Sequence, residues 1–469
     1  MKFDFSNIIK TMDSTQTEAS YEKIDKSFII QGCAGSGKTA ILLHRPSYLA
    51  YNNPDYAWSR VALVTPNEEF VDYVRNLFGE LELKDNNIQL YSLEKYYASI
   101  IEKYDHELSF KIAESNSEKN KSGVIFKVDE ITVNPNEGDL PAEYLERIYA
   151  PSFFNIIQND FKKYAAEIES KKQDIAAEIH QLSTLQKTTT DDWIIKISKL
   201  ADKARALGVN KAVAEKYKTK SNANYIEKTI DYKSFQYVTK TLIGERIQRL
   251  RDEFKIANLG HNEFYRHDLY LLMLALSEVN GPLGEKCGNK ALYIDEGQDI
   301  SPTEYKLIKK INNNPVFNIY GDIDQNLTPW RGLSSWDDIK DLGIEEIKKF
   351  DIDYRNTKQI CDYISKALKM DIQSPLEGKF EVEKLTTEEL FENMTKYPEK
   401  AIVVMVVSDK ESEFAKKVME IRPNSEIITP AESKGFEYPK LFVNPEGMTH
   451  NEKYVAMTRA LYYLTVIKD

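Results

Sequence analysis

The sequence is poor in cysteine and histidine and contains no long apolar run. Its three cysteines, Cys33, Cys287 and Cys361, lack metal-ligand spacing and an even disulfide framework, so we expect a reducing, cytoplasmic environment. No stretch approaches the length of a membrane span, and the first residues lack the apolar core of a signal peptide. We therefore expect no membrane association. The net charge of −11 argues against nucleic-acid binding through bulk electrostatics.

A glycine-rich loop near the N-terminus carries the strongest chemical signal. An apolar run from Ser27 to Gln31 leads into Gly-x-x-x-x-Gly-Lys-Thr, and a helix-forming stretch follows. This order of strand, loop and helix is that of a phosphate-binding P-loop, in which backbone N–H groups, a lysine and the helix dipole attract phosphate. The residues expected to bind a nucleoside triphosphate are Gly32, Gly35, Ser36, Gly37 and Lys38, and the Thr39 hydroxyl is expected to ligate Mg²⁺. A ligand-free glycine turn is the alternative that these flanks disfavour.

Two stretches of the chain read as α/β. Short β-branched runs alternate with helical patterns in residues 1–104, and the same pattern returns after residue 260. Such alternation predicts parallel sheets flanked by helices. The strands expected from this pattern are 61–65, 88–91, 291–296, 316–322, 401–407 and 463–467.

Residues 105–260 differ in character from both flanks. They are rich in lysine and tyrosine, have few strand signals, and show helical periodicity over 152–185 and 191–217. We expect a mostly helical insertion that divides the first α/β domain into 1–104 and 261–342, followed by a second α/β domain over 343–469. Lysine and arginine exceed aspartate and glutamate between residues 161 and 255. Both a solvated helical face and a phosphate-facing surface fit that excess.

A second signature ends the strand expected at 291–296. Asp295 and Glu296 stand at the strand end, where a P-loop enzyme places its acids. Asp295 would hold Mg²⁺, and Glu296 would orient and deprotonate the attacking water. An ordinary acidic turn is the alternative, but the following Gly-Gln-Asp makes the pattern far more specific.

Asp-Glu-Gly-Gln-Asp at 295–299 is similar to the Asp-Glu-x-Gln-Asp box of superfamily 1 helicases of the UvrD/Rep type. The further boxes occur in the family's order. The chain resembles motif III at 321–325 and 330–332, motif IV at 354–357, motif V at 433–438, motif VI at 454–460, and the Q motif at Gln16. The resemblance implies an α/β fold of two RecA-like P-loop domains with a mostly helical insertion in the first.

The same resemblance assigns roles to residues around ATP and Mg²⁺. Gln16 would read the adenine edge, Tyr354 would stack on the base, and Glu437 would lie near the ribose. The residues implied at the γ-phosphate are Gln325, Arg355 and Arg459. Because both arginines belong to the second α/β domain, ATP would draw the two domains together and hydrolysis would release them.

The resemblance also implies a nucleic-acid track. Trp330 would stack on a base of single-stranded DNA or RNA, Arg331 would lie near a phosphate, and Thr65 would join them. The implied activity is 3′→5′ translocation on single-stranded DNA. An ATP-driven remodeller or regulatory subunit of a protein complex, docked through 105–260, is the alternative; its targets would be RNA polymerase or an anti-phage partner. A P-loop kinase of a small molecule leaves Arg459 and the glutamine boxes unexplained.

Within the family, the chain looks closest to the helicase IV/HelD branch. The run 43–49 after the P-loop and the segment 65–67 carry this likeness. The chain begins close to Gln16, so we expect no N-terminal coiled-coil arm. Motifs IV and V are also too close together for a full 2B subdomain. Ala40 and Ala431 replace the arginine and histidine common in UvrD-type enzymes.

Overall fold

The computed structural model describes residues 12–65, 71, 75, 88–104, 109–112, 130–134, 137–184, 238–257, 263–284, 287–396 and 403–468. The chain divides into two compact units. Unit 1 comprises residues 1–90, 289–305 and 315–469, and unit 2 comprises residues 91–288 and 306–314. The helix expected at 191–217 and most of the one expected after residue 65 lie outside the described residues.

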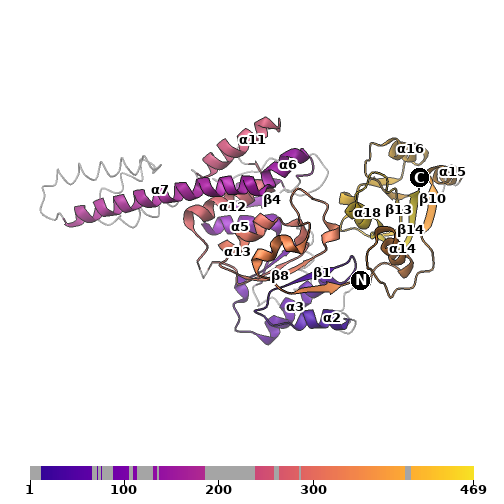
Figure 1. Ribbon diagram of the computed structural model, residues 1–469, viewed down its shortest axis with the longest axis horizontal. Coiled ribbons are helices and arrows are strands. Elements are labelled where there is room, and N and C mark those ends of the chain that lie inside the picture. Colours follow the sequence, from indigo (N-terminus) through magenta and orange to yellow (C-terminus); the bar gives the residue numbers. More distant parts are fainter. Residues whose placement is uncertain are drawn as a thin grey trace. The chain divides into compact units, whose positions relative to one another are not determined.

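Unit 1 contains a six-stranded sheet with the order β3-β2-β7-β8-β1-β9. Its strands are β1 (Phe28–Gly32), β2 (Val61–Thr65), β3 (Gln89–Ser92), β7 (Ala291–Ile294), β8 (Val316–Gly321) and β9 (Ile347–Phe350). The pairs β2·β7, β7·β8, β8·β1 and β1·β9 are all parallel. The α/β alternation expected from the sequence is confirmed. Figure 1 shows helices α2 (Ser14–Tyr21) and α3 (Lys38–Asn52) beside β1 and β8.

A buried arginine joins α2 to α3. Arg45 is fully buried, and its guanidinium donates to the carbonyls of Glu22 (2.6 Å) and Lys23 (2.8 Å) at the end of α2. Its Nε donates to Asn318 Oδ1 on β8 at 2.7 Å. These bonds satisfy carbonyls that the end of a helix leaves without intrahelical partners. They therefore fix α2, which carries Gln16, against the sheet.

A second sheet in unit 1 has the order β10-β14-β13-β11-β12, and its four strand pairs are parallel. Its strands are β10 (Glu383–Thr386), β11 (Val404–Val406), β12 (Glu426–Ile428), β13 (Tyr438–Val443) and β14 (Ala460–Lys468). One apolar cluster packs α14 (Lys358–Leu368) and α18 (His450–Met457) on one face. Another packs α15 (Thr387–Lys396) and α16 (Glu413–Ile421) on the opposite face. This sheet lies within the second α/β stretch expected from the sequence (Figure 1).

Short elements connect these strands. They are η1 (Trp58–Arg60), η4 (Gly297–Asp299), α13 (Pro302–Ile311), η5 (Ile323–Gln325), η6 (Trp336–Leu342) and α17 (Pro430–Ser433). Several begin with side-chain caps; the Thr429 hydroxyl, for example, accepts the N–H of Glu432 and starts α17.

Among its described residues, unit 2 is mostly helical and also contains a short sheet. Its helices are α5 (Leu93–Tyr104), α6 (Ala142–Tyr149), α7 (Pro151–Thr184), η3 (Leu242–Ile247), α11 (Gln248–Glu253) and α12 (Arg266–Asn280). The helix expected at 152–185 is confirmed as α7. The strands β4 (Ser109–Ile112), β5 (Glu130–Asn134) and β6 (Glu263–Tyr265) form a parallel sheet that the sequence did not predict. Two of them lie inside 105–260. They were not predicted because such short strands in a polar segment show no clear alternation of apolar and polar residues.

A buried polar network lies at the centre of unit 2. His267 Nδ1 is 2.6 Å from Glu137 Oε1, and its Nε2 is 2.9 Å from the Tyr144 hydroxyl. Beside it, Arg251 forms an ion pair with Asp268, and both side chains are almost fully buried. This pairing satisfies charges that would otherwise be costly to bury.

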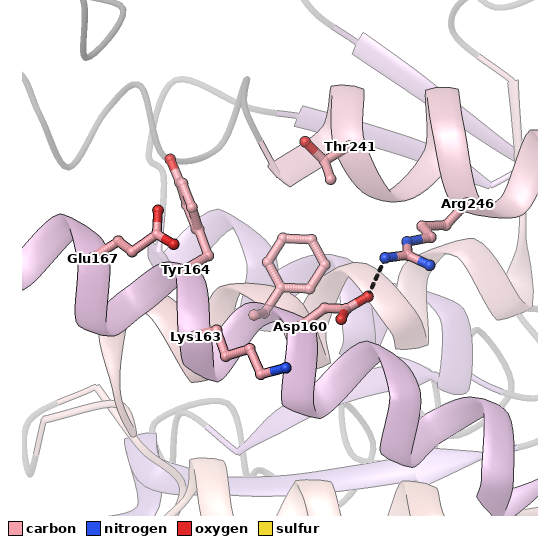
Figure 2. Close-up of a pocket in the computed structure, with 7 residues that line it drawn as sticks. Asp160, Lys163, Tyr164, Glu167, Thr241 and Arg246 are labelled. Atoms are coloured by element: carbon pink, nitrogen blue, oxygen red, sulfur yellow. Dashed lines mark ion pairs between the residues drawn. The ribbon is translucent and has the colours of Figure 1, made fainter.

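A cavity of about 220 Å³ lies between α7 and η3 in unit 2. Figure 2 shows Asp160 directed toward Arg246 across it, with an N–O distance of 2.5 Å between them. Its lining carries two acidic and two basic side chains, so it has no net preference for a charged ligand. Within the described ranges, no helix combines the length and apolar character needed to span a bilayer.

Candidate functional site

The site forms where neighbouring parallel strands of the first sheet end. The P-loop follows β1, Asp295 follows β7, and Asp322 follows β8. Because β7, β8 and β1 are adjacent and parallel, their carboxyl ends meet at one edge of the sheet. This edge is where open α/β sheets bind ligands.

The P-loop has the conformation that its glycines allow. Gly35 and Gly37 have φ values of +72° and +79°, which side-chain-bearing residues rarely adopt. A Cβ at Gly35 would also lie only 2.0 Å from Asp353 Oδ1. Lys38 begins α3 and donates from Nζ to the carbonyls of Gly32 (2.7 Å) and Cys33 (3.0 Å). The lysine is thus held at the loop, beside the helix N-terminus.

The donor set fits a magnesium–triphosphate group. Ser36 Oγ is buried and has no hydrogen-bond partner among the described residues, so the loop has an unused polar group. Thr39 Oγ1 donates to Asp295 Oδ2 at 3.2 Å, which brings together a hydroxyl and a carboxylate. Oxygen ligands of this kind suit Mg²⁺. These two residues would hold the ion.

The paired acids have opposite pKa shifts. Burial, followed by the negative charge of Glu296, raises the pKa of Asp295 to about 7. Burial would also raise the pKa of Glu296, but the positive charges of Lys434 and Lys38 outweigh it and lower that pKa. Gln298 Nε2 donates to Glu296 Oε2 at 2.5 Å and supports the ionised form. Glu296 is therefore a carboxylate at neutral pH, as a general base requires.

The second sheet contributes two arginines to the same site. Arg459 precedes β14, and its Nη2 lies 3.4 Å from Gln325 Oε1. Burial, together with the nearby Arg355 guanidinium, lowers the pKa of Arg459 to about 10, so the side chain remains charged at neutral pH. Arg355 donates to Glu437 Oε1 at 3.1 Å and to the Thr458 carbonyl at 3.2 Å. The structure thus brings together the four residues expected to act on the γ-phosphate side, including Glu296.

The two residues expected at the adenine are also near the loop. Gln16 Nε2 donates to the Ser36 carbonyl at 2.9 Å, and Gln16 Oε1 accepts the N–H of Asp13 at 3.1 Å. The Tyr354 hydroxyl donates to Asp13 Oδ2 at 2.9 Å, while the Tyr354 N–H donates to the Gly35 carbonyl at 3.0 Å. Asp13 therefore connects the two side chains at one end of the P-loop.

The residues expected at the nucleic-acid track are placed differently. Trp330 is half-buried, and Thr65 is buried at the end of β2. Arg331, expected near a phosphate, is instead buried, and its Nε and Nη2 donate to the Glu304 carboxylate at 3.2 and 3.3 Å. A guanidinium held in this way stabilises the loop after η5. Its placement corrects the expectation of a phosphate contact.

Three further residues, Lys434, Tyr454 and Asp322, lie at the site, and the sequence assigned no role to them. Lys434 Nζ donates to Asp299 Oδ2 at 2.7 Å and lies 3.6 Å from Glu296 Oε2. The Tyr454 hydroxyl donates to Asp322 Oδ2 at 3.0 Å. All three residues lie inside recognised boxes, so their position was available from the sequence. Their bonding partners were not, because these lie more than one hundred residues away along the chain.

A family model described as the UvrD/REP helicase N-terminal domain matches residues 12–335, more than half of the chain. The match includes the P-loop and the acids after β7. Among curated proteins, no sequence matches the chain significantly.

Solved helicase structures show distant similarity. Arterivirus nonstructural protein 10 (helicase), alone and in a complex with DNA, matches at 12% identity and a TM-score of 0.35. Each match covers 97% of this chain, and 61% and 62% of the respective viral chains. The helicase of PRRSV matches at 15% identity and a TM-score of 0.27, covering 39% of this chain and 35% of that one. The chain thus spans less than two thirds of the length of each of these helicases.

Proposed function

Because the chain belongs to the UvrD/REP helicase family, we propose that it is an ATP-driven motor that moves along single-stranded DNA. One observation supports the proposal: residues associated with both sheets of unit 1 lie together at the P-loop edge. The first sheet provides the P-loop and Glu296, and Arg459 comes from the second. An ATPase that divides its site in this way can convert nucleotide turnover into movement of one sheet domain relative to the other.

Hydrolysis would use the chain's own groups as follows. Lys38 and the P-loop amides bind the phosphates. Thr39 and Asp295 would hold Mg²⁺, which would supply positive charge against the phosphate oxygens. The Glu296 carboxylate accepts the proton of the attacking water, and Arg459 meets the charge that develops on the transferred group. Gln325, in contact with Arg459, orients the reacting groups.

The finer features of the motor are part of the same proposal. Trp330 is half-buried, which leaves part of its ring available to stack on a base of the track. The resemblance of motifs I to VI supports 3′→5′ movement. The run 43–49 supports the helicase IV/HelD branch. Arg45 in this run forms hydrogen bonds with the end of α2 and with Asn318 on β8. A protein partner, in this proposal, would dock through residues 105–260.

The test is ATP hydrolysis by the full chain with and without single-stranded DNA, single-stranded RNA or blunt duplex DNA. We expect Mg²⁺-dependent hydrolysis that single-stranded DNA stimulates strongly and duplex does not. Glu296→Gln is the matched inactive control, since loss of a general base costs about 10²–10⁴ in rate. Hydrolysis that no nucleic acid stimulates would contradict a translocase and favour a protein-directed remodeller. Absence of ATP hydrolysis would contradict both.

A further inference from the structure

Asp322, which follows β8, is the centre of a hydrogen-bond cluster next to the P-loop. Its Oδ1 accepts from Gln31 Nε2 at 2.8 Å and from the Asp324 N–H at 3.3 Å. Its Oδ2 accepts from Gln325 Nε2 at 2.8 Å and from the Tyr454 hydroxyl at 3.0 Å. The carboxylate is 1% exposed. Four donors therefore fix its orientation away from water.

Tyr454 is the member of this cluster that belongs to the second sheet's helices. It lies on α18 and is fully buried. Its hydroxyl donates to Asp322 and also accepts the N–H of Ala34 in the P-loop at 2.8 Å. One hydroxyl therefore connects α18, the P-loop backbone and the carboxylate after β8. Burial and the negative charge of Asp322 raise the pKa of Tyr454 well above its usual value, so the hydroxyl keeps its proton for donation.

The cluster determines how Gln325 faces the site. A glutamine amide can present either its oxygen or its nitrogen in a given direction. Here Nε2 is held by Asp322 Oδ2, which leaves Oε1 toward Arg459 Nη2 at 3.4 Å. Tyr454 shares the same Oδ2 and so restricts rotation of the carboxylate that holds the amide.

We propose that the Tyr454 hydroxyl is a positioning group for ATP hydrolysis: by fixing Asp322, it keeps Gln325 oriented toward Arg459 when α18 lies against the P-loop. This proposal rests on the proposed ATPase function. It gives the second sheet a further link to the reacting groups, through α18 and Gln325. Tyr454 touches no substrate in this scheme and acts only through Asp322 and Gln325.

A simple packing role for Tyr454 would need the ring and not the hydroxyl. Tyr320, two residues before Asp322, illustrates that case. It is fully buried on β8, and its hydroxyl has no hydrogen-bond partner among the described residues. Tyr320→Phe and Tyr454→Phe remove the same atom from two buried rings, so the first variant is a matched control for the second.

The test compares kcat and KM for ATP in the two variants, on the full chain with saturating single-stranded DNA. Hydrogen bonds to charged groups are strong enough that losing one costs about ten- to a hundredfold in an equilibrium or rate. We expect Tyr454→Phe to lower kcat by about that factor and to change KM less than about threefold, since the phosphate-binding donors remain. Tyr320→Phe should keep the wild-type kcat. A kcat within about threefold of wild type in Tyr454→Phe would overturn the proposal.

Two further measurements separate positioning from packing. In a Gln325→Ala background, Tyr454→Phe should lower kcat by less than about twofold, because the group that it positions is already gone. Full multiplication of the two effects would overturn the proposal. Amide hydrogen exchange tests the contact between the Ala34 N–H and the Tyr454 hydroxyl without turnover. The Ala34 amide should exchange faster than in the wild type in Tyr454→Phe and at the wild-type rate in Tyr320→Phe. A wild-type chain without ATPase activity would refute the proposed function, whereas an active wild type with an unaffected Tyr454→Phe would refute this inference alone.

Discussion

Lys434 Nζ lies 3.6 Å from Glu296 Oε2, so a cation from the second sheet's loops faces the carboxylate expected to activate water. The same ammonium donates to Asp299 Oδ2 and to the Gln325 carbonyl. Burial would raise the pKa of Glu296, but positive charges nearby lower it, and Lys434 makes the largest contribution to this lowering. The basicity of Glu296 thus depends on the approach of the second sheet.

Replacing Lys434 should therefore change the pH dependence of turnover. In Lys434→Ala, the Glu296 carboxylate loses a stabilising charge and its pKa rises. A base that must be deprotonated then becomes active only at higher pH, so the acid limb of the kcat–pH profile should move to higher pH. Lys434→Arg should keep the wild-type limb, as should Lys416→Ala on the exposed face of α16. An unmoved limb in Lys434→Ala would show that the lysine does not tune the base.

Asp295 should make the metal-free protein sensitive to pH. Its folded-state pKa of about 7 lies above the usual 3.8, so the folded state prefers the protonated acid. The cost of holding the buried carboxylate is complete above pH 7, decreases as pH falls from 7 to about 4, and disappears below that. In EDTA, Asp295→Asn should raise the melting temperature at pH 8 and lose this advantage near pH 4. Equal stabilisation at both pH values would contradict the assignment.

Trp330 tests the nucleic-acid track. Stacking on a base contributes roughly 1–3 kcal/mol, so Trp330→Ala should weaken single-strand affinity about ten- to a hundredfold. Hydrolysis without nucleic acid should survive, because no P-loop residue is altered. Trp330→Phe, which keeps an aromatic face, should recover part of the affinity in a fluorescence-anisotropy titration. Joint loss of basal and stimulated hydrolysis in Trp330→Ala would place the residue in the core.

Much of the fold was predictable because each long-range feature had a local signal. The glycine-rich loop after β1 and the acids after β7 mark two strand ends, and the β-branched runs at β2 and β8 mark their neighbours. The second sheet followed from the same pattern. In the sheet of unit 2, the strands β4, β5 and β6 are only three to five residues long and are far apart along the chain, so this sheet was missed.

The site shows the same division between local and distant information. Lys38, Asp295 and Arg459 stand in boxes whose chemistry can be read locally. The proposed role of Tyr454 depends on its contact with Asp322, 132 positions away, and a tyrosine on an apolar helix face reads as core. Arg331 was misread for the related reason that a sequence does not show burial: its partner Glu304 removes it from solvent.

Unit 2 should not tolerate removal of 105–260, although the sequence suggested a separable insertion. The unit also includes α12, whose residues Leu269–Leu276 are at most 1% exposed. Tyr270 on this helix stacks on Tyr149 and Phe154, both of which the deletion removes. A protein in which a Gly/Ser linker replaces 105–260 should therefore aggregate, as judged by size-exclusion chromatography. A soluble, nucleotide-binding 105–260 replacement would refute this account of the unit.

The central claim is that one ATPase site is completed by residues of both sheets, and Arg459 tests it most directly. The measurement is kcat for Mg²⁺-ATP hydrolysis on saturating single-stranded DNA in Arg459→Ala, with nucleotide affinity measured in parallel. An arginine that meets transition-state charge contributes about 10³–10⁵ in rate, so kcat should fall by at least about a thousandfold while ATP affinity changes little. Turnover within about tenfold of wild type would contradict the account.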